Sequence, residues 1–437
     1  MARLNILIVG ASIAGPTAAY WFAKAGANVT IIERFPKMRT NGQNVDIRTV
    51  GVNVMRKMKG MESAVRAKKL DLEGISFVSG GGEPLGTIKP TGNPDLQSLV
   101  SEYEIFRGDL AQILFDLTKN DRSIRYVFGE QVVSMHQSDS FDGPITVEFA
   151  NGLPTAQYDL VVACDGATSR TRSIGLGCDT RDHMIPMNGW AAYFSIKQDL
   201  LEGSKLGVSY SAIGGRFVAI GPDPVGVSRV VLMCFQPSES RDAMLPFREA
   251  MKKGDDSLKQ FIAQHYRGAG WKTEEVINGL IEADDFYSNE IVQVKVPSLY
   301  KGRFVLVGDA GYASSVGTGT SLAIAGAYVL AGEVCKNNGD LAAALNSYEQ
   351  QMRPIIDDLQ AIPPLMFTIL APQTSWGLRL RNSILGFIIW TRILEFGQKY
   401  FARAFASSDK YHLREYKWCS EDTSGTGRVG QQGQPAE

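Results

Sequence analysis

Apolar and polar residues follow each other along this chain with two different periods, and the changes of period mark out its elements. Residues 6 to 9 form a short, wholly apolar run, which is typical of a strand buried on both faces. A glycine-containing turn, a helical pattern and a second apolar run follow within residues 10 to 33. This order predicts a strand, a helix and a second strand parallel to the first.

The turn after the first strand carries residue types that suit a bound pyrophosphate. Gly10 opens a tight turn, Ser12 stands in place of the second glycine of G-x-G-x-x-G, and Gly15 lets the helix pack close to the strand. Glu33 follows at the expected distance of about 20 residues, where its carboxylate can accept both hydroxyls of an adenosine ribose. We therefore predict a dinucleotide-binding βαβ unit with the pyrophosphate at the helix N-terminus. The alternative is a strand-turn-helix that binds nothing.

Later segments switch between the two periods several times. Residues 72 to 99 read as a hairpin in an antiparallel sheet, and residues 188 to 237 as further strands separated by turns. Residues 242 to 283 and 321 to 337 have helical patterns, and residues 303 to 308 form another buried strand. The predicted fold is α/β, with a discontinuous Rossmann-like cofactor domain (residues 1–71, 100–175 and 290–360). A β-sheet substrate domain (72–99 and 176–289) is interleaved with it. C-terminal helices (361–417) and a disordered tail (418–437) follow.

Composition narrows the classes of partner and compartment. The 45 basic and 46 acidic residues leave a net charge of −1, which gives no reason to expect nucleic acid or an anionic membrane as a partner. Five cysteines without a C-x-x-C pair fit reduced thiols, and the four histidines show no metal-ligand spacing. With no signal peptide pattern and no apolar run of about 18 residues, we expect a cytoplasmic protein that acts on a small molecule, without a metal or a transmembrane span. The oligomeric state stays open.

Two further motifs follow the βαβ unit in the chain. In the first, an apolar strand runs into Asp165 and Gly166, and Ser169 and Arg172 come shortly after. In the second, the strand at residues 303 to 308 ends in Asp309, which can hold ribityl hydroxyls, and a glycine-rich loop then leads into a helix. The N-terminal amides of that helix would favour negative charge placed beside them.

These three motifs, in this order, resemble the group A FAD-dependent monooxygenases, which are single-component aromatic hydroxylases with the fold of para-hydroxybenzoate hydroxylase. The segment from Glu104 to Leu110 is similar to the family's E-x-x-R-x-D-L element. The loop between Tyr312 and Gly317 departs from the family, because it contains no proline and is about two residues shorter. The resemblance implies that FAD is bound by Gly10, Ser12, Ile13, Ala14, Gly15, Glu33, Arg34, Arg107, Asp165, Gly166, Asp309, Gly317, Gly319 and Thr320.

The same resemblance implies an activity and candidate catalytic residues. NADPH or NADH would reduce the flavin, and O2 would add to give a C4a-hydroperoxide. An aromatic, polyketide or terpenoid-like substrate would then be hydroxylated or epoxidised, as a step of secondary metabolism. Arg48 matches a position near the flavin, and Arg216 resembles an arginine that lines the active site; a surface position is the alternative for Arg48. Tyr193, Tyr210 and Met233 lie on predicted strands and can face either the pocket or the opposite layer, and Tyr193 is our third catalytic candidate.

Other functions stay open at this stage. A flavin-dependent halogenase is disfavoured because its W-x-W-x-I-P element is absent, Trp190 being followed by Ala-Ala-Tyr. A reductase or dehydrogenase of the same fold, or a non-redox cyclase or scaffold, would also fit the motifs. Residues 376 to 405 carry apolar side chains at helical spacing, and we expect them to cap the pocket rather than to form a dimer face or rest on a membrane.

Overall fold

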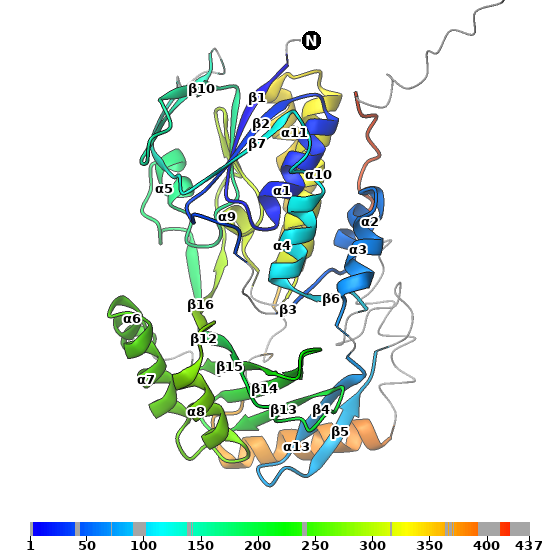
Figure 1. The fold of residues 1–437 in the computed structure, drawn as a ribbon, viewed down its shortest axis with the longest axis vertical. Helices are drawn as coiled ribbons and strands as arrows, with labels where there is room; N and C mark the ends of the chain where they lie inside the picture. Colours follow the sequence, from blue (N-terminus) through cyan, green and yellow to red (C-terminus); the bar gives the residue numbers. More distant parts are fainter. Residues whose placement is uncertain are drawn as a thin grey trace, which may run out of the picture.

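Two β-sheets of different construction lie at opposite ends of the molecule (Figure 1). The computed structural model describes residues 3–39, 44–70, 72–90, 102–137, 141, 143–237, 243–314, 317–362, 366, 369, 371–391 and 411–419. The expected tail at residues 420 to 437 lies outside these described residues. The α/β class predicted from the sequence is confirmed by the presence of both sheets with helices packed against them.

The first sheet has six strands within the described residues, and its central strands run parallel. β1 pairs in parallel with both of its neighbours, β2 and β11. Residues 6 to 9 are buried throughout because helices α1 (Ala14–Lys24) and α10 (Gly319–Lys336) cover one side of the sheet and a small sheet carrying β10 (Ala156–Tyr158) lies on the other (Figure 1). The strand order is β17 (Tyr300–Lys301), β18 (Phe304–Leu306), β11 (Leu160–Ala163), β1 (Asn5–Val9), β2 (Asn28–Glu33) and β7 (Ile124–Phe128).

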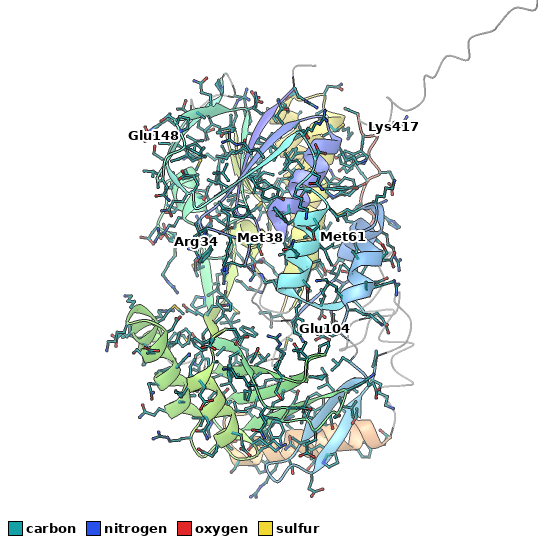
Figure 2. The ribbon with its side chains drawn as sticks, viewed as in Figure 1. Arg34, Met38, Met61, Glu104, Glu148 and Lys417 are labelled. Atoms are coloured by element: carbon teal, nitrogen blue, oxygen red, sulfur yellow. The ribbon has the colours of Figure 1, made fainter. Side chains whose placement is uncertain are left out.

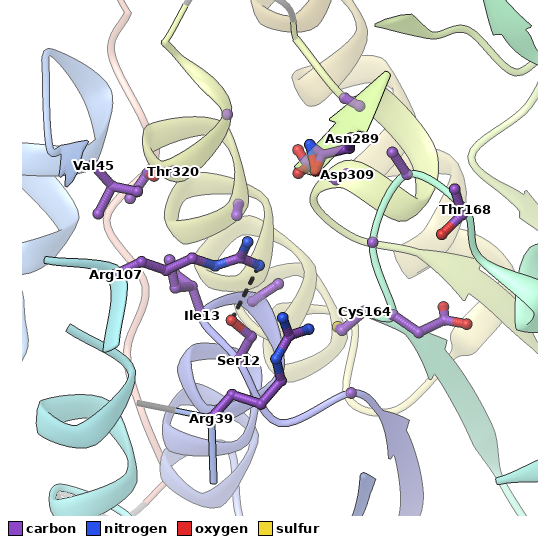
Figure 3. A pocket seen from close by; sticks show the side chains of 18 of the residues that line it. Ser12, Ile13, Arg39, Val45, Arg107, Cys164, Thr168, Asn289, Asp309 and Thr320 are labelled. Carbon is purple, nitrogen blue, oxygen red and sulfur yellow. Dashed lines mark hydrogen bonds between the residues drawn. The ribbon is translucent and has the colours of Figure 1, made fainter. Parts of the chain in front are cut away.

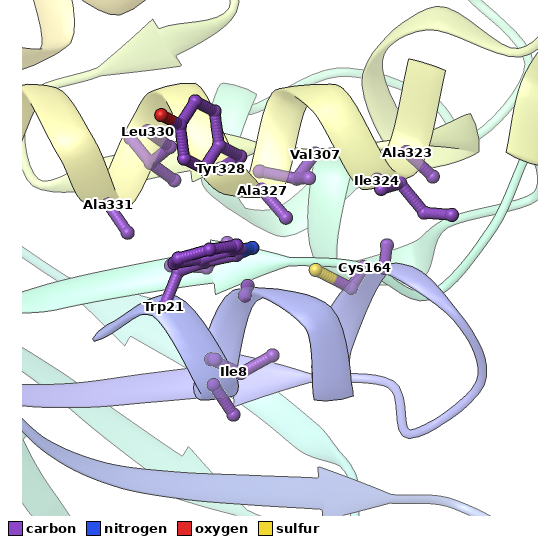
Figure 4. Close-up of a cluster of buried hydrophobic side chains, with 14 of the residues drawn as sticks. Ile8, Trp21, Cys164, Val307, Ala323, Ile324, Ala327, Tyr328, Leu330 and Ala331 are labelled. Atoms are coloured by element: carbon purple, nitrogen blue, oxygen red, sulfur yellow. The ribbon is translucent and has the colours of Figure 1, made fainter. Parts of the chain in front are cut away.

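Close packing of helices on this sheet depends on glycine and on one large aromatic side chain. A Cβ on Gly15 would lie 1.9 Å from the carbonyl oxygen of Gly10, so only glycine lets α1 approach the turn this closely. Trp21 of α1 fills the space against α10, where its ring meets that of Tyr328 edge-on at 4.9 Å (Figure 4). Together these contacts fix where α1 begins relative to the sheet.

The second sheet has seven described strands and mixes strand directions. β4 and β5 form the antiparallel hairpin that the sequence predicts, but β4 pairs in parallel with β13. A long stretch of chain joins β4 to β13, so the antiparallel direction that a hairpin imposes does not apply to this pair. The strand order is β16 (Tyr287–Val294), β12 (Met184–Ile196), β15 (Ser228–Phe235), β14 (Arg216–Pro222), β13 (Leu206–Ala212), β4 (Gly74–Val78) and β5 (Pro84–Ile88).

The two faces of this second sheet have different partners. Every second residue of β15 is buried, and Val230, Leu232 and Cys234 belong to a core shared with three helices. These helices are α6 (Leu245–Lys252), α7 (Asp255–Tyr266) and α8 (Thr273–Glu282). The intervening residues, such as Val231 and Met233, face the opposite way and line cavities between the two sheets. The period of two along each strand therefore separates core residues from cavity residues.

The remaining elements surround the first sheet or connect it to the second. The β3–β6 pair is antiparallel and lies between the two sheets (Figure 1). These elements are α1 (Ala14–Lys24), β3 (Asn44–Asp46), α2 (Val50–Lys57), α3 (Met61–Lys68), β6 (Glu104–Phe106), α4 (Arg107–Asp116), β8 (Val132–His136), β9 (Ile145–Phe149), β10 (Ala156–Tyr158), α5 (Arg170–Leu176), α9 (Asp309–Tyr312), α10 (Gly319–Lys336) and α11 (Leu341–Gln360).

The C-terminal part differs from the helical segment that the sequence predicts. α13 (Ser375–Trp390) is a helix and packs along β5, but residues 411 to 419 have no regular secondary structure. Trp418 stacks on Trp21 at 4.8 Å, and Tyr416 donates a hydrogen bond to the buried Glu333. Residues 418 and 419, which we expected in the tail, are thus part of a packed segment. Its conformation comes from tertiary contacts, which a helical period cannot reveal.

No helix in the described part of the chain is long and apolar enough to cross a bilayer. Among the same residues, no group of three histidine, cysteine, aspartate or glutamate side chains is arranged to hold a metal ion.

Candidate functional site

A cavity of about 490 Å³ lies where the carboxyl ends of the parallel strands meet the second sheet. Gly10, Ser12, Ile13 and Ala14 form part of its wall. α1 begins at Ala14, and no side chain among the described residues caps its N-terminus, so the amides of its first turn remain available to an anion. This is the place that the sequence predicts for a pyrophosphate.

The end of β2 contributes Glu33 and Arg34 to the same wall. Glu33 Oε2 accepts a hydrogen bond from the amide of Ala11 at 3.0 Å, and Oε1 accepts one from the amide of Phe35 at 3.1 Å. These bonds hold the carboxylate beside the glycine turn. A carboxylate oxygen can accept more than one hydrogen bond, so both oxygens keep capacity for ribose hydroxyls.

The second motif forms a compact bend at the end of β11. Asp165 accepts hydrogen bonds from the hydroxyl of Ser169 and from both the amide and the hydroxyl of Thr171. Burial raises the pKa of Asp165, and these bonds offset part of that rise. Arg172 is fully buried and donates to the carbonyl of Ala310 at 2.9 Å. The second motif is therefore tied directly to the third.

The third motif places Asp309 in the cavity beside the start of α10. Gly317, Gly319 and Thr320 line the same wall, and a Cβ on Gly319 would lie 3.1 Å from Asp309 Oδ1. Asp309 is exposed on the side of the cavity, and protein atoms surround its carboxyl elsewhere. Burial raises the pKa of its carboxyl, and the charge of Arg107 offsets only part of that rise. A ligand that donates hydrogen bonds here would stabilise the ionised carboxylate.

The guanidinium groups of Arg107 and Arg39, from two separate segments of the chain, reach into the cavity (Figure 3). Arg107, at the start of α4, donates from Nη2 to Ser12 Oγ at 3.3 Å, which brings the E-x-x-R-x-D-L element to the glycine turn. Arg39 lies 4.7 Å from the centre of the Phe35 ring and 5.5 Å from that of Tyr287. Our sequence prediction missed Arg39, because it lies in an irregular segment after β2 that belongs to no motif.

Asn289 of β16 was also missed, and it gives the clearest sign that the cavity is shaped for a ligand. Its side-chain oxygen is buried without a hydrogen-bond partner among the described residues, although the residue lines the cavity (Figure 3). Buried acceptors in folded proteins are nearly always paired, so an unpaired one at a cavity wall suits a ligand that donates. The pyrophosphate, ribose and ribityl contacts expected for FAD fit the same cavity, since amides, carboxylates and guanidinium groups all converge on it.

A second cavity, of about 300 Å³, lies over the open face of the second sheet. Asn44, Tyr193, Met233 and Tyr287 line both cavities, so the two adjoin along these residues. The rings of Tyr193 and Tyr287 are stacked with centres 6.2 Å apart. Burial raises the pKa of Tyr193 to about 12, so its hydroxyl stays protonated at neutral pH and can donate a hydrogen bond.

Arg229 and Glu104 are two of the polar residues that line the second cavity. Arg229 donates to Asp223 at 2.7 Å and to Ser195 at 2.6 Å, and its guanidinium lies 4.7 Å from the centre of the Phe106 ring. Glu104 of β6 lies between the two sheets (Figure 2) and accepts a hydrogen bond from Asn44 at 3.1 Å. Burial, and secondarily the carboxylate of Asp46, raise the pKa of Glu104 to about 7.

The three catalytic candidates from the sequence are not brought together. Tyr193 lines both cavities. Arg48 lies beside the larger one, where its guanidinium pairs with Asp46 at 2.6 Å and its amide donates to Ser321 Oγ of α10 at 2.8 Å. Arg216 lines neither cavity, because it shares the helix-covered face of β14 with Val218, and its guanidinium donates to the carbonyl of His265 at 3.1 Å. Its position therefore gives no support for a catalytic role.

Two further expectations can be compared with the described residues. The ring of Tyr210 packs in the helix-covered core and its hydroxyl donates to the carbonyl of Ala269 at 2.6 Å, whereas Met233 faces the cavities. The helix α13 lines neither cavity, so the described part of residues 376 to 405 does not cap the pocket.

Comparison with known proteins agrees with this geometry. The family model for the FAD binding domain matches residues 3–361. The chain is 32% identical over 421 residues to the FAD-dependent monooxygenase asL4 of Sarocladium schorii, which covers 90% of this chain and 94% of the relative. The crystal structure of the tetracycline destructase Tet(51) superposes with a TM-score of 0.73 at 26% identity, covering 95% of this chain and 100% of that one. Klebsiella pneumoniae HpxO complexed with FAD and uric acid shares the fold, with a TM-score of 0.68 at 19% identity over 91% of this chain and 96% of that one.

Proposed function

Because the chain belongs to the group A FAD-dependent monooxygenases, we propose that it uses NADPH or NADH and O2 to hydroxylate or epoxidise an electron-rich small molecule. Bound FAD would supply the redox chemistry, in which the nicotinamide reduces the flavin and O2 then forms the C4a-hydroperoxide that donates an oxygen atom. The substrate class we favour is an aromatic, polyketide or terpenoid-like compound of secondary metabolism. The name of one similar structure, the tetracycline destructase Tet(51), supports this choice.

The observation that carries the proposal is the contact between the two cavities. The larger one gathers the groups that suit FAD, and the smaller one is walled mainly by aliphatic and aromatic side chains. Tyr193, Met233 and Tyr287 stand at their shared boundary. A substrate in the smaller cavity would therefore lie next to the cofactor, against a largely apolar wall.

On the cofactor side, we propose that the charged groups divide the binding of FAD between them. The first turn of α1 would hold the pyrophosphate, Glu33 the adenosine ribose, and Asp309 the ribityl chain. Arg107 would contact the ribityl or phosphate region. The amides at the start of α10 would lie near the flavin ring, where they stabilise negative charge. Arg48 would act near the flavin during reduction by the nicotinamide.

On the substrate side, two polar residues of the smaller cavity are our candidates for contact with the substrate. Tyr193 would donate a hydrogen bond to a substrate oxygen, and Glu104 would accept or return a proton near neutral pH. The apolar residues between them would select a flat or compact hydrocarbon framework by shape. Arg229 is engaged by Asp223 and Ser195, so it serves chiefly to hold the cavity wall.

A spectroscopic experiment tests the redox part of this proposal. The purified protein should show a flavin spectrum that bleaches when NADPH or NADH is added under argon and recovers in air. A panel of phenolic and polyketide compounds should then include some that accelerate bleaching. A protein that neither retains FAD nor binds it on reconstitution would contradict the proposal and favour a non-redox scaffold.

A further inference from the structure

Cys335 and Cys419 are far apart in the chain, but their sulfur atoms lie 3.5 Å apart. Cys335 is partly exposed in the last turn of α10, and Cys419 is exposed at the end of the described C-terminal segment. A shift of about 1.5 Å would bring the two sulfurs to the length of a disulfide bond. No short motif joins the two cysteines, because 84 residues separate them.

Residues 411–419, which we call the C-terminal strap, cross the surface of α10 in close contact. A Cβ on Gly332 would lie 2.2 Å from ring atoms of Tyr416, so α10 has a glycine where the strap crosses it. The hydroxyl of Tyr416 donates to the buried Glu333 at 2.9 Å, and the ring of Trp418 stacks on a tryptophan of α1 at 4.8 Å. These contacts fix the position of the strap, and that position holds its cysteine beside α10.

The two thiols differ in how easily an oxidant can reach and activate them. Cys335 Sγ donates to the carbonyl of Lys417 at 3.4 Å, a bond that requires the thiol proton. Cys335 also lies at the C-terminal end of α10, where the helix dipole disfavours a negative charge. Burial raises the pKa of this thiol to about 11. Cys419 is exposed to solvent, so it is the thiol that an oxidant in solution meets first.

We propose that Cys335 and Cys419 form an oxidation-sensitive pair, which hydrogen peroxide converts into a disulfide that ties the C-terminal strap to α10. The Cys419 thiolate would attack one peroxide oxygen, so that an S–O bond forms, the O–O bond breaks and the released hydroxide takes up a proton to give water. The sulfur of Cys335 would then attack the resulting sulfenic acid. The S–S bond forms, the S–O bond breaks, and the thiol proton leaves with the second water. The two sulfurs together lose the two electrons that the peroxide gains.

The other three cysteines are not placed for this reaction. Cys164 and Cys234 are buried. Cys178 is partly exposed, but its charged neighbours are arginine, aspartate and lysine side chains rather than a second thiol. Neither member of the proposed pair lines a cavity described above, so this inference does not depend on the proposed function.

Peptide mapping of the full-length protein under non-reducing conditions tests the proposal. After treatment with hydrogen peroxide, we expect a peptide that joins Cys335 to Cys419, which dithiothreitol should separate. The link should raise the Tm of the wild type by about 3 °C, because it closes a long loop of the unfolded chain. Cys419→Ser should show no such rise. Cys178→Ser is the matched control, since it removes a partly exposed cysteine outside the pair, and it should behave as the wild type does.

The single variants also test the order of the two steps. In Cys335→Ser the sulfenic acid of Cys419 has no neighbouring thiol to react with. Dimedone, which traps sulfenic acids, should therefore label Cys419 at least about fivefold more strongly than in the wild type. In Cys419→Ser the label on Cys335 should stay at background. Strong labelling of Cys335 in that variant would contradict the assigned order.

Two results for the wild type would overturn the proposal. The first is the absence of the linked peptide, whether Cys419 stays reduced, is oxidised further or joins a second molecule, because the two thiols would then not meet in solution. The second is a linked peptide without any rise in Tm, because the strap would then not be tied to the folded protein. Samples with and without dithiothreitol decide both questions, so neither answer depends on the folding of a variant.

Discussion

The walls of the two adjoining cavities are built in different ways. In the larger cavity the key groups follow the ends of parallel strands, as Gly10 follows β1, Asp165 follows β11 and Asp309 follows β18. In the smaller cavity they lie along strands, where neighbouring residues face opposite sides. A group at a strand end stays at the site if the register shifts by one residue, but a group along a strand moves to the other face.

The two regions should therefore respond differently to substitution. Substitutions at the strand ends should act mainly on cofactor binding. Changes along the second sheet should affect either catalysis or folding, depending on which face carries the residue.

The largest effect is expected at the glycine turn. In Gly15→Ala the new Cβ would lie 1.9 Å from the backbone oxygen of Gly10, so α1 must shift away from the turn. We expect loss of most bound FAD and destabilisation by about 1–3 kcal/mol. Flavin content and urea unfolding measure the two effects. Gly81→Ala is the control, because its Cβ would meet nothing nearer than Ser79 Oγ at 3.8 Å. A Gly15→Ala protein with full flavin content would contradict the close approach.

A smaller effect on the same side is expected for Asp309→Asn. Replacing a charged acceptor by a neutral one should weaken FAD binding by about tenfold, measured by flavin fluorescence. The apoprotein should respond in the opposite direction. Burial raises the pKa of Asp309 in the folded state, so folding stability falls as the pH rises from its ordinary value of 3.8 through the raised pKa. Removing the charge should therefore stabilise the apoprotein at neutral pH. Asp116→Asn, on the surface of α4, should change neither quantity.

The second sheet offers a matched pair of tyrosines on opposite faces. Tyr193→Phe removes a hydroxyl that lines both cavities, and we expect kcat/KM to fall by about two- to tenfold with normal stability and flavin content. Tyr210→Phe leaves the carbonyl of Ala269 without its donor in the helix-covered core. It should cost about 1 kcal/mol of stability and leave the kinetics of the folded enzyme unchanged. Equal kinetic losses in both variants would contradict the account, in which the face of the sheet decides whether a tyrosine serves catalysis or stability.

The smallest effect concerns pH. The pKa of Glu104 is raised to about 7 in the folded protein from an ordinary value of 4.5, so the wild type binds an extra proton on folding and loses stability as the pH rises through that interval. Glu104→Gln should remove this loss. The difference in Tm between the variant and the wild type should therefore be small at pH 5 and grow in favour of the variant up to pH 8. A difference independent of pH would contradict the raised pKa.

The contrast between the regions also explains what the sequence could predict. The three motifs, the family and the α/β class follow from local patterns. A glycine turn and an acidic residue at a fixed spacing mark where the strands end, and they can be recognised without knowing the rest of the fold. The domain boundaries and the FAD contacts of individual residues stay predictions. Arg39 was not foreseen, since only the packing of Phe35 and Tyr287 around it brings it to the cavity.

The sequence could not predict which face of the second sheet each side chain lies on, and the reason is physical. Tyr193 and Tyr210 both lie in alternating strands, and alternation alone does not say which set meets the helices and which meets the cavity. Arg216 was a candidate because it begins a predicted strand and resembles an arginine that lines the active site of related enzymes, but its face of β14 is covered by α7. The order of residues 411 to 419 likewise depends on Trp21 and Glu333, which are distant in the chain.

The central claim is that an oxygen atom passes from a flavin in the larger cavity to a substrate in the smaller one. Turnover under ¹⁸O2 with NADPH or NADH, followed by mass spectrometry of the product, tests it most directly. We expect one labelled oxygen in the product of the wild type and a proportionate loss of labelled product, without loss of bound flavin, in Tyr193→Phe. Product formed without label, or formed equally well in the absence of O2, would contradict the account.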